Sequence, residues 1–173
     1  MNRVLPPHSS FTSTQTPIQF RLISRATVRT ANGQVEGKAQ WDTGATNTCI
    51  SKKVVDDLKL IPTGRKTVHT PSGNAIQNTY LVDIELPNNV TMTNVMVFGS
   101  EIGAQGIDVL IGMDIISRGD FAVSNFEGTT KFSFRSPSVK HTDFVQETNA
   151  SNIMGKIQTH GQGSTRKRHK ASK

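Results

Sequence analysis

The sequence has little cysteine and few aromatic residues: 173 residues include one cysteine, Cys49, one tryptophan and one tyrosine. A single cysteine excludes a disulfide within the chain, and it leaves no cysteine cluster for a metal, so we expect neither metal nor cofactor. Cys49 is interpreted as a small buried hydrophobic residue. No apolar run resembles a signal peptide or approaches the roughly 18 residues of a membrane span. A cytoplasmic protein without membrane contact is therefore expected.

Hydrophobic residues are also scarce, at 34% of the chain, and they are scarcest at the two ends. Residues 1–17 are rich in Ser, Thr and Pro, and residues 137–173 are mostly polar. Neither end can bury much apolar surface, so we predict a flexible N-terminal segment and a disordered C-terminal tail. Residues 18–136 remain as one folded domain, which is long enough for a single hydrophobic core.

The net charge of +7 is unevenly distributed along the chain. Residues 1–136 carry 13 Lys and Arg against 11 Asp and Glu, whereas residues 137–173 carry 7 against 2. The sequence pI of 9.9 therefore reflects the tail, which argues against nucleic-acid binding by the domain. The basic run at residues 164–173 is either a solvated tail or a weak nucleic-acid contact driven by counterion release.

The pattern of the domain is mostly β. Strands are predicted over residues 18–30, 35–41, 66–70, 75–86, 91–98, 107–111, 119–125 and 130–134. Two short helices are predicted, at residues 52–60 with Ser51 as the N-cap and at residues 113–118. Many short strands with frequent turns and two brief helices indicate a small closed or sandwich-like β fold.

One short run, Asp42-Thr43-Gly44-Ala45, follows a predicted strand and carries the chemistry. An isolated Asp-x-Gly is often only a turn. Two carboxylates that share one proton can, however, activate water for peptide hydrolysis. Gly44 permits a tight turn, the Thr43 hydroxyl can lock that turn to the backbone, and Ala45 leaves room for a substrate chain. The chain holds a single Asp-Thr-Gly, and Asp56, Asp57 and Asp108 are interpreted as surface or capping residues.

A second run, from Ile107 to Ile116, reads as a buried strand that ends at Gly112 and enters a helical turn. In isolation it would be ordinary core. Gly112 lies 70 positions after Asp42, a spacing that suits packing behind the aspartate loop. Asp114 is interpreted as a hydrogen-bond acceptor at the start of the helical turn, and Trp41 as a packing residue.

Together, Asp42-Thr43-Gly44-Ala45 and Leu110-Ile111-Gly112-Met113-Asp114 resemble the retropepsin family, the retroviral-type aspartic proteases and their bacterial and cellular relatives. The resemblance implies a closed, barrel-like acid protease fold that forms one half of a symmetric homodimer. It implies an endopeptidase that cleaves peptide or protein substrates without a metal. It assigns catalysis to Asp42, Thr43 and Gly44, substrate binding to Ala45 and to the flap residues Thr70, Pro71, Ser72, Gly73 and Asn74, and a structural second motif to Ile111, Gly112 and Asp114.

The chain departs from the family at two positions. Retroviral members commonly pair an acidic residue after Asp-Thr-Gly-Ala with an Arg after the second-motif Gly, and here these positions are Thr46 and Met113. Both charges are missing together, so no unpaired charge remains, and we expect a weaker dimer. Two alternatives stay open: a non-catalytic retropepsin-like module that dimerises or binds peptides, and a nucleic-acid-associated protein that acts through its basic tail.

Overall fold

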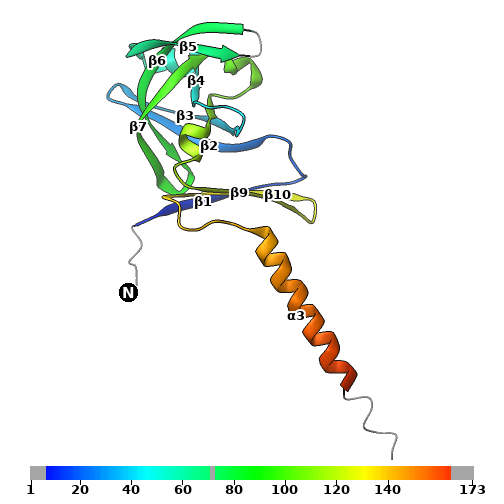
Figure 1. Ribbon diagram of the computed structural model, residues 1–173. Coiled ribbons are helices and arrows are strands. Elements are labelled where there is room, and N and C mark those ends of the chain that lie inside the picture. The colour runs from blue at the N-terminus through cyan, green and yellow to red at the C-terminus, as the bar shows by residue number, and fades with distance from the viewer. Residues whose placement is uncertain (1–6, 71–72, 165–173) are drawn as a thin grey trace, which may run out of the picture. The chain divides into compact units, whose positions relative to one another are not determined.

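The computed structural model describes residues 7–70 and 73–164 (Figure 1). The chain divides into two compact units, residues 1–139 and residues 140–173. The strands are β1 (Ser9–Gln15), β2 (Leu22–Thr30), β3 (Gly33–Trp41), β4 (Cys49–Ser51), β5 (Gly64–Thr70), β6 (Gly73–Leu86), β7 (Val90–Ser100), β8 (Val109–Ile111), β9 (Asp120–Phe126) and β10 (Thr129–Ser136). The helices are α1 (Lys52–Asp57), α2 (Met113–Ile116) and α3 (Phe144–Ser164), with 3-10 turns η1 (Pro87–Asn89) and η2 (Ile102–Gln105).

A closed β-barrel forms the body of the first unit. Its sheet has the strand order β2-β3-β8-β4-β7-β6-β5, and a second pairing of β2 with β6 closes the barrel and leaves β5 outside it. Alternate residues of each strand point inward, as Ala39 and Trp41 of β3 and Val109 and Ile111 of β8 do, and these side chains are buried. The barrel confirms the closed β fold expected from the sequence.

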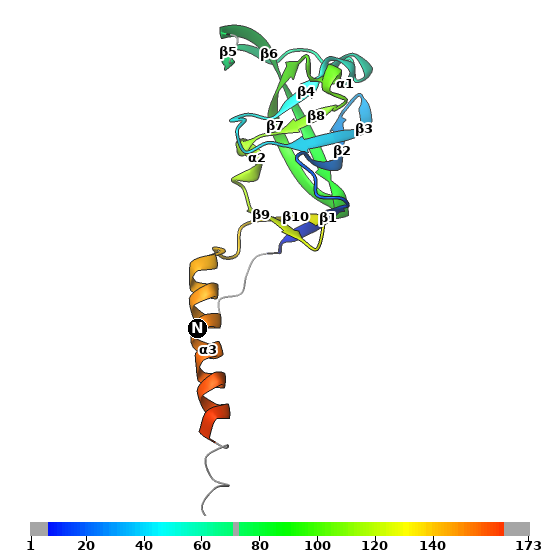
Figure 2. The ribbon, with the colours of Figure 1, turned by 90° about the vertical axis from the view of Figure 1, so that its right-hand side faces the viewer.

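A three-stranded sheet of order β1-β10-β9 lies at the end of the unit opposite the β5–β6 hairpin (Figures 1 and 2). Its aromatic side chains pack on Trp41, the last residue of β3. Trp41 stacks on Phe121 with ring centroids 5.3 Å apart, and its indole N–H donates to the Ser24 hydroxyl at 3.0 Å. The prediction that Trp41 is a packing residue is confirmed, and this packing holds the end of β3 that leads into Asp42.

The structure corrects the prediction of a flexible segment at residues 1–17 for the part that forms β1. Seven residues of β1, from Ser9 to Gln15, pair with β10 in antiparallel register. Phe11 is buried within the aromatic cluster, while most of the Ser and Thr side chains face outward. A strand with one buried face needs few apolar residues, which is why its composition resembled that of a tail.

The predicted disorder of residues 137–173 is likewise corrected for α3, which spans Phe144–Ser164. Asp143 caps the helix, because its carboxylate accepts from the N–H groups of Val145 and Gln146 at 3.0 and 3.2 Å. Residues 144–154 are exposed. None of the helices in the described residues is both long and apolar enough to cross a membrane.

Smaller differences concern element ends. The Ser51 N-cap is confirmed, since its hydroxyl accepts from the Val54 N–H, but α1 ends at Asp57 instead of residue 60. Lys59 adopts a φ of 48°, which no helix interior allows. The first predicted strand begins at Leu22 instead of residue 18. The short strand β4 was not predicted, because three residues show no periodicity.

Candidate active site

Asp42 directly follows β3, and its main-chain N–H donates to the Ile111 carbonyl of β8 at 3.0 Å. The parallel pairing of β3 with β8 therefore continues to the aspartate itself. The Asp42 side chain is half-buried, and its Oδ1 accepts from the Gly44 N–H at 2.8 Å. This bond orients the carboxylate, and a tight turn is completed by the Ala45 N–H, which donates to the Asp42 carbonyl at 3.2 Å.

The Asp42 carboxylate thus fastens the turn to its own backbone, and the turn-locking role of the Thr43 hydroxyl stays a prediction. Thr43 and Gly44 are exposed at the tip of the loop, and Ala45 is half-buried. A Cβ added at Gly44 would lie 3.2 Å from Asp42 Oδ1, a tight contact. Glycine at this position therefore lets the loop backbone approach the carboxylate.

Main-chain hydrogen bonds join the aspartate loop to the second motif. The Met113 N–H donates to the Ala45 carbonyl at 2.8 Å, and the Asp114 N–H donates to the Thr46 carbonyl at 3.1 Å. Thr46 and Met113 are the two positions that lack the family's usual ion pair. In this chain, neutral backbone bonds connect the same two segments.

Thr48 and Asp114 add a side-chain link between the same segments. The fully buried Thr48 hydroxyl donates to Asp114 Oδ1 at 2.7 Å and accepts from the Gly112 N–H at 3.1 Å. Asp114 Oδ2 accepts from the Thr48 N–H at 3.0 Å. The interpretation of Asp114 as a hydrogen-bond acceptor is confirmed. The part played by Thr48 was missed, although a threonine so close to Asp-Thr-Gly is a usable signal.

Gly112 packs against the aspartate loop at a distance that excludes any side chain. A Cβ at this position would lie 2.6 Å from the Asn47 carbonyl carbon and 3.0 Å from the Ala45 carbonyl oxygen. The second motif therefore does lie behind the loop, with Ile111 fully buried beneath it.

Among the predicted substrate-binding residues, Thr70, Gly73 and Asn74 belong to the β5–β6 hairpin, where Thr70 pairs with Gly73. Gly73 has a φ of +114°, which suits the end of a hairpin turn. Pro71 and Ser72 lie outside the described residues. The hairpin projects from the barrel in both views (Figures 1 and 2).

The sheet face that carries Asp42 continues across three neighbouring strands. Gln40 of β3, Leu110 of β8 and Cys49 of β4 are partners in register, and all three side chains are half-buried. Burial raises the pKa of the Cys49 thiol from 9.0 to about 11, and the negative charge of Asp114 adds to this effect. The Gln40, Leu110 and Cys49 side chains on this face are therefore uncharged at neutral pH.

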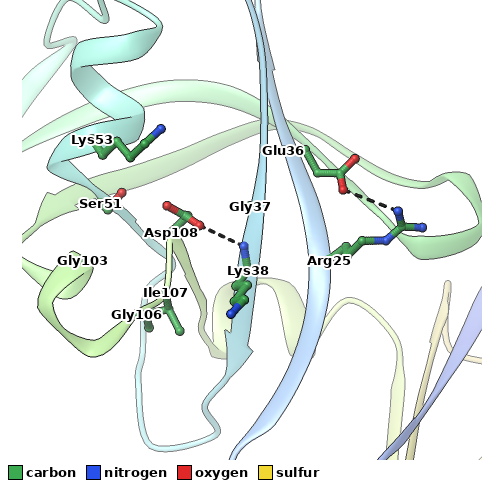
Figure 3. A pocket seen from close by; sticks show the side chains of 10 residues that line it. All are labelled: Arg25, Glu36, Gly37, Lys38, Ser51, Lys53, Gly103, Gly106, Ile107 and Asp108. Atoms are coloured by element: carbon green, nitrogen blue, oxygen red, sulfur yellow. Dashed lines mark hydrogen bonds and ion pairs between the residues drawn. The ribbon is translucent and has the colours of Figure 1, made fainter.

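A cavity of about 790 Å³ lies beside the middle of β3 (Figure 3). Gly37, which lines it, precedes Asp42 by five residues, or roughly 16 Å of strand. Its charges serve the fold: Asp108 Oδ2 accepts from the Lys38 N–H at 3.0 Å, and Arg25 pairs with Glu36 at 3.5 Å. The cavity is separate from the aspartate loop. Within the described residues, no group of three His, Cys, Asp or Glu side chains could hold a metal ion.

Comparison with solved structures finds similar folds among retropepsin-like proteases. A retropepsin-like aspartic protease from Rickettsia conorii is 18% identical over 77% of this chain and 98% of its own, with a TM-score of 0.49. Simian foamy virus protease is 21% identical over 56% of this chain and 92% of its own, with a TM-score of 0.41. EIAV protease is 15% identical over 60% of this chain and 91% of its own, with a TM-score of 0.45.

No curated protein sequence matches the chain. The family model described as "gag-polyprotein putative aspartyl protease" matches residues 26–118, which is more than half of the chain and includes both the aspartate loop and the second motif. The chain therefore belongs to this family of retropepsin-like aspartic proteases.

Proposed function

We propose that the protein is an aspartic endopeptidase in which two copies of the chain each supply Asp42. The single observation that carries the proposal is the Asp42 loop itself. Its carboxylate is half-buried, oriented by the Gly44 N–H and supported from behind by Gly112. Such preorganisation suits a catalytic group, whereas a surface turn would not need a second element packed against it.

The chemistry requires a second carboxylate, and the chain has one Asp-Thr-Gly. Two carboxylates a few ångströms apart cannot both ionise, so the pair shares one proton. The ionised member removes a proton from water, and the protonated member donates to the carbonyl oxygen of the scissile peptide bond. A homodimer with Asp42 on its two-fold axis supplies the pair.

The remaining residues have supporting roles in this proposal. Thr43, exposed beside the aspartate, contacts the partner copy across the axis. Ala45 and the β5–β6 hairpin, including Thr70, Gly73 and Asn74, enclose an extended segment of a protein substrate. Ile111, Gly112 and Asp114 hold the loop in position through the contacts described above.

The test is digestion of a peptide library by the full chain, with products identified by mass spectrometry. Asp42→Asn keeps the shape of the side chain but cannot accept the proton, so we expect cleavage to fall below detection. Asp57→Asn is the matched control: Asp57 pairs with Lys53 on the exposed face of α1, and its loss should leave cleavage unchanged.

Inhibitors and the pH dependence of cleavage provide a second test. A statine-type inhibitor should block cleavage, a chelator should not, and activity should be highest at acidic to mildly acidic pH, where the pair retains its proton. Cleavage by Asp42→Asn at the wild-type rate would contradict the mechanism. Peptide binding without cleavage by the wild-type chain would instead favour the non-catalytic module.

A further inference from the structure

The Arg21 guanidinium, directly before β2, is held by two neutral acceptors. Its Nε–H donates to Gln40 Oε1 at 2.6 Å, and Nη2 donates to the Gln105 carbonyl of η2 at 3.1 Å. The side chain thus bridges β3 and η2, while the residue as a whole is exposed. These two hydrogen bonds fix the orientation of the guanidinium plane, whereas the guanidinium of a surface arginine without such bonds can rotate.

Gln40 places this cation beside the candidate catalytic aspartate. Side chains two residues apart on a strand point to the same face, so Gln40 and Asp42 share one face of β3, with their Cα atoms about 7 Å apart. Both are half-buried, whereas Ala39 and Trp41 between and beside them face the core. Arg21 therefore borders the surface on which a substrate next to Asp42 would lie.

Within the part of the chain that the structure describes, no carboxylate neutralises the charge of Arg21. In residues 7–70 and 73–164, Arg25, Arg29 and Arg135 each have a carboxylate partner, but Arg21 forms no ion pair. Both of its acceptors are uncharged oxygens. They orient the guanidinium and leave its positive charge available to a ligand.

The unused donors have the geometry of a carboxylate site. A guanidinium has five N–H groups. The edge formed by Nε and Nη2 contacts Gln40 and Gln105. The other edge keeps one N–H on each of Nη1 and Nη2, side by side, which is the fork that binds both oxygens of a carboxylate.

We propose that Arg21 is a specificity-determining residue that binds a substrate carboxylate near the scissile bond, an inference that rests on the proposed function. The carboxylate belongs either to an Asp or Glu side chain or to the free C-terminus of a peptide. The shared chemistry is bidentate binding of one anionic carboxylate. The neutral surface formed by Gln40, Leu110 and Cys49 adds no competing negative charge.

The test compares fluorogenic peptides that differ only by Glu or Gln at each position flanking the scissile bond, each with an amidated and a free C-terminus. We expect Glu to raise kcat/KM by about twofold to fivefold at one position, the size typical of an exposed ion pair. If the carboxylate is that of the C-terminus, amidation will remove the preference. Added salt should weaken it in either case.

Arg21→Gln should abolish the preference, and Arg21→Lys should restore part of it, because lysine keeps the charge but not the fork. Arg29→Gln is the matched control. It removes an arginine eight residues along the chain, which pairs with Glu85, and it should keep the preference. Dimerisation of each variant is measured in parallel by sedimentation.

Equal kcat/KM for Glu and Gln peptides, or a preference that survives Arg21→Gln, would overturn the inference. So would loss of the dimer in Arg21→Gln, since Arg21 would then bind the partner copy. A binding arm separates this inference from the proposed function. Suppose that the wild-type chain cleaves no peptide, but the Asp42→Asn chain binds labelled Glu peptides more tightly than Gln peptides and loses this difference when Arg21→Gln is added. Then only the proposed function fails. If neither peptide binds, the inference fails.

Discussion

At the scale of single residues, Gly112 is the position where one added methyl group most directly disturbs the aspartate loop. The Cβ of Gly112→Ala would overlap the Asn47 carbonyl at 2.6–2.7 Å, and backbone cannot move aside as a side-chain end can. We expect a loss of about 1–3 kcal/mol in the free energy of unfolding, measured in urea, together with a large loss of kcat/KM.

Gly103→Ala is the control for that substitution. Its Cβ would meet Ser51 Cβ at 3.8 Å, an ordinary contact. Stability and activity should stay close to wild type. An equally stable and active Gly112→Ala protein would show that the second motif does not support the loop.

The reactivity of the Cys49 thiol reports how well the surface beside the aspartate is shielded from solvent. Because burial raises the pKa of Cys49 to about 11, the folded chain holds a neutral thiol at pH 8, whereas the unfolded chain with the ordinary pKa is partly ionised. A thiol reagent should therefore react slowly with the folded protein and quickly in denaturant.

The same shift in the pKa of Cys49 sets a pH dependence of stability. Between pH 9.0 and about 11 the unfolded chain loses the proton while the folded chain keeps it, so the free energy of unfolding should fall as pH rises through this window. Cys49→Ala should remove that component. Rapid labelling of the native protein at pH 8 would contradict the burial.

At the scale of elements, β1 is the strand whose role is most testable. Phe11 is buried among Trp41, Phe132 and Phe134, with ring centroids 5.6–6.4 Å away. Phe11→Ala should lower the free energy of unfolding by about 3–5 kcal/mol. Phe20→Ala, at a fully exposed position, should change it by less than about 0.5 kcal/mol. Equal effects of the two substitutions would mean that β1 is not docked.

The contrast between β1 and β8 explains what the sequence could and could not predict. The apolar run at Val109–Ile111 ends at Gly112 beside a known motif, so both the strand and its place behind Asp42 were predicted. β1 has one buried aromatic among polar residues, and its stability depends on β10, more than a hundred residues away. Composition within a short window carries no information about such a partner.

The residues of the candidate site also fall into two groups, those that the sequence predicted and those that it did not. Asp42, Gly44, Gly112 and Asp114 were found because two short motifs carry them. The link from Thr48 to Asp114 and the bridge from Arg21 to Gln40 and Gln105 were not predicted. They join residues that are brought together only by the strand order β2-β3-β8-β4.

At the scale of the whole molecule, the two units should separate in function. Val139 donates its N–H to Asp120 Oδ2 at 2.9 Å, so a chain cut after Val139 keeps this contact. We expect the truncated chain to dimerise and cleave peptides as the full chain does, and to lose any salt-dependent affinity for RNA. Loss of the dimer would mean that residues 140–173 contribute to the interface.

The most direct test of the central claim, that two chains share one active site, is a mixing titration. Wild-type chain and Asp42→Asn chain are equilibrated at constant total concentration, above the dimer dissociation constant, and peptide cleavage is measured as the wild-type fraction is varied. Mixed dimers hold one working carboxylate, so activity should fall with the square of the wild-type fraction. Activity that falls only in proportion to the wild-type fraction would show that each chain acts alone, and would contradict the account.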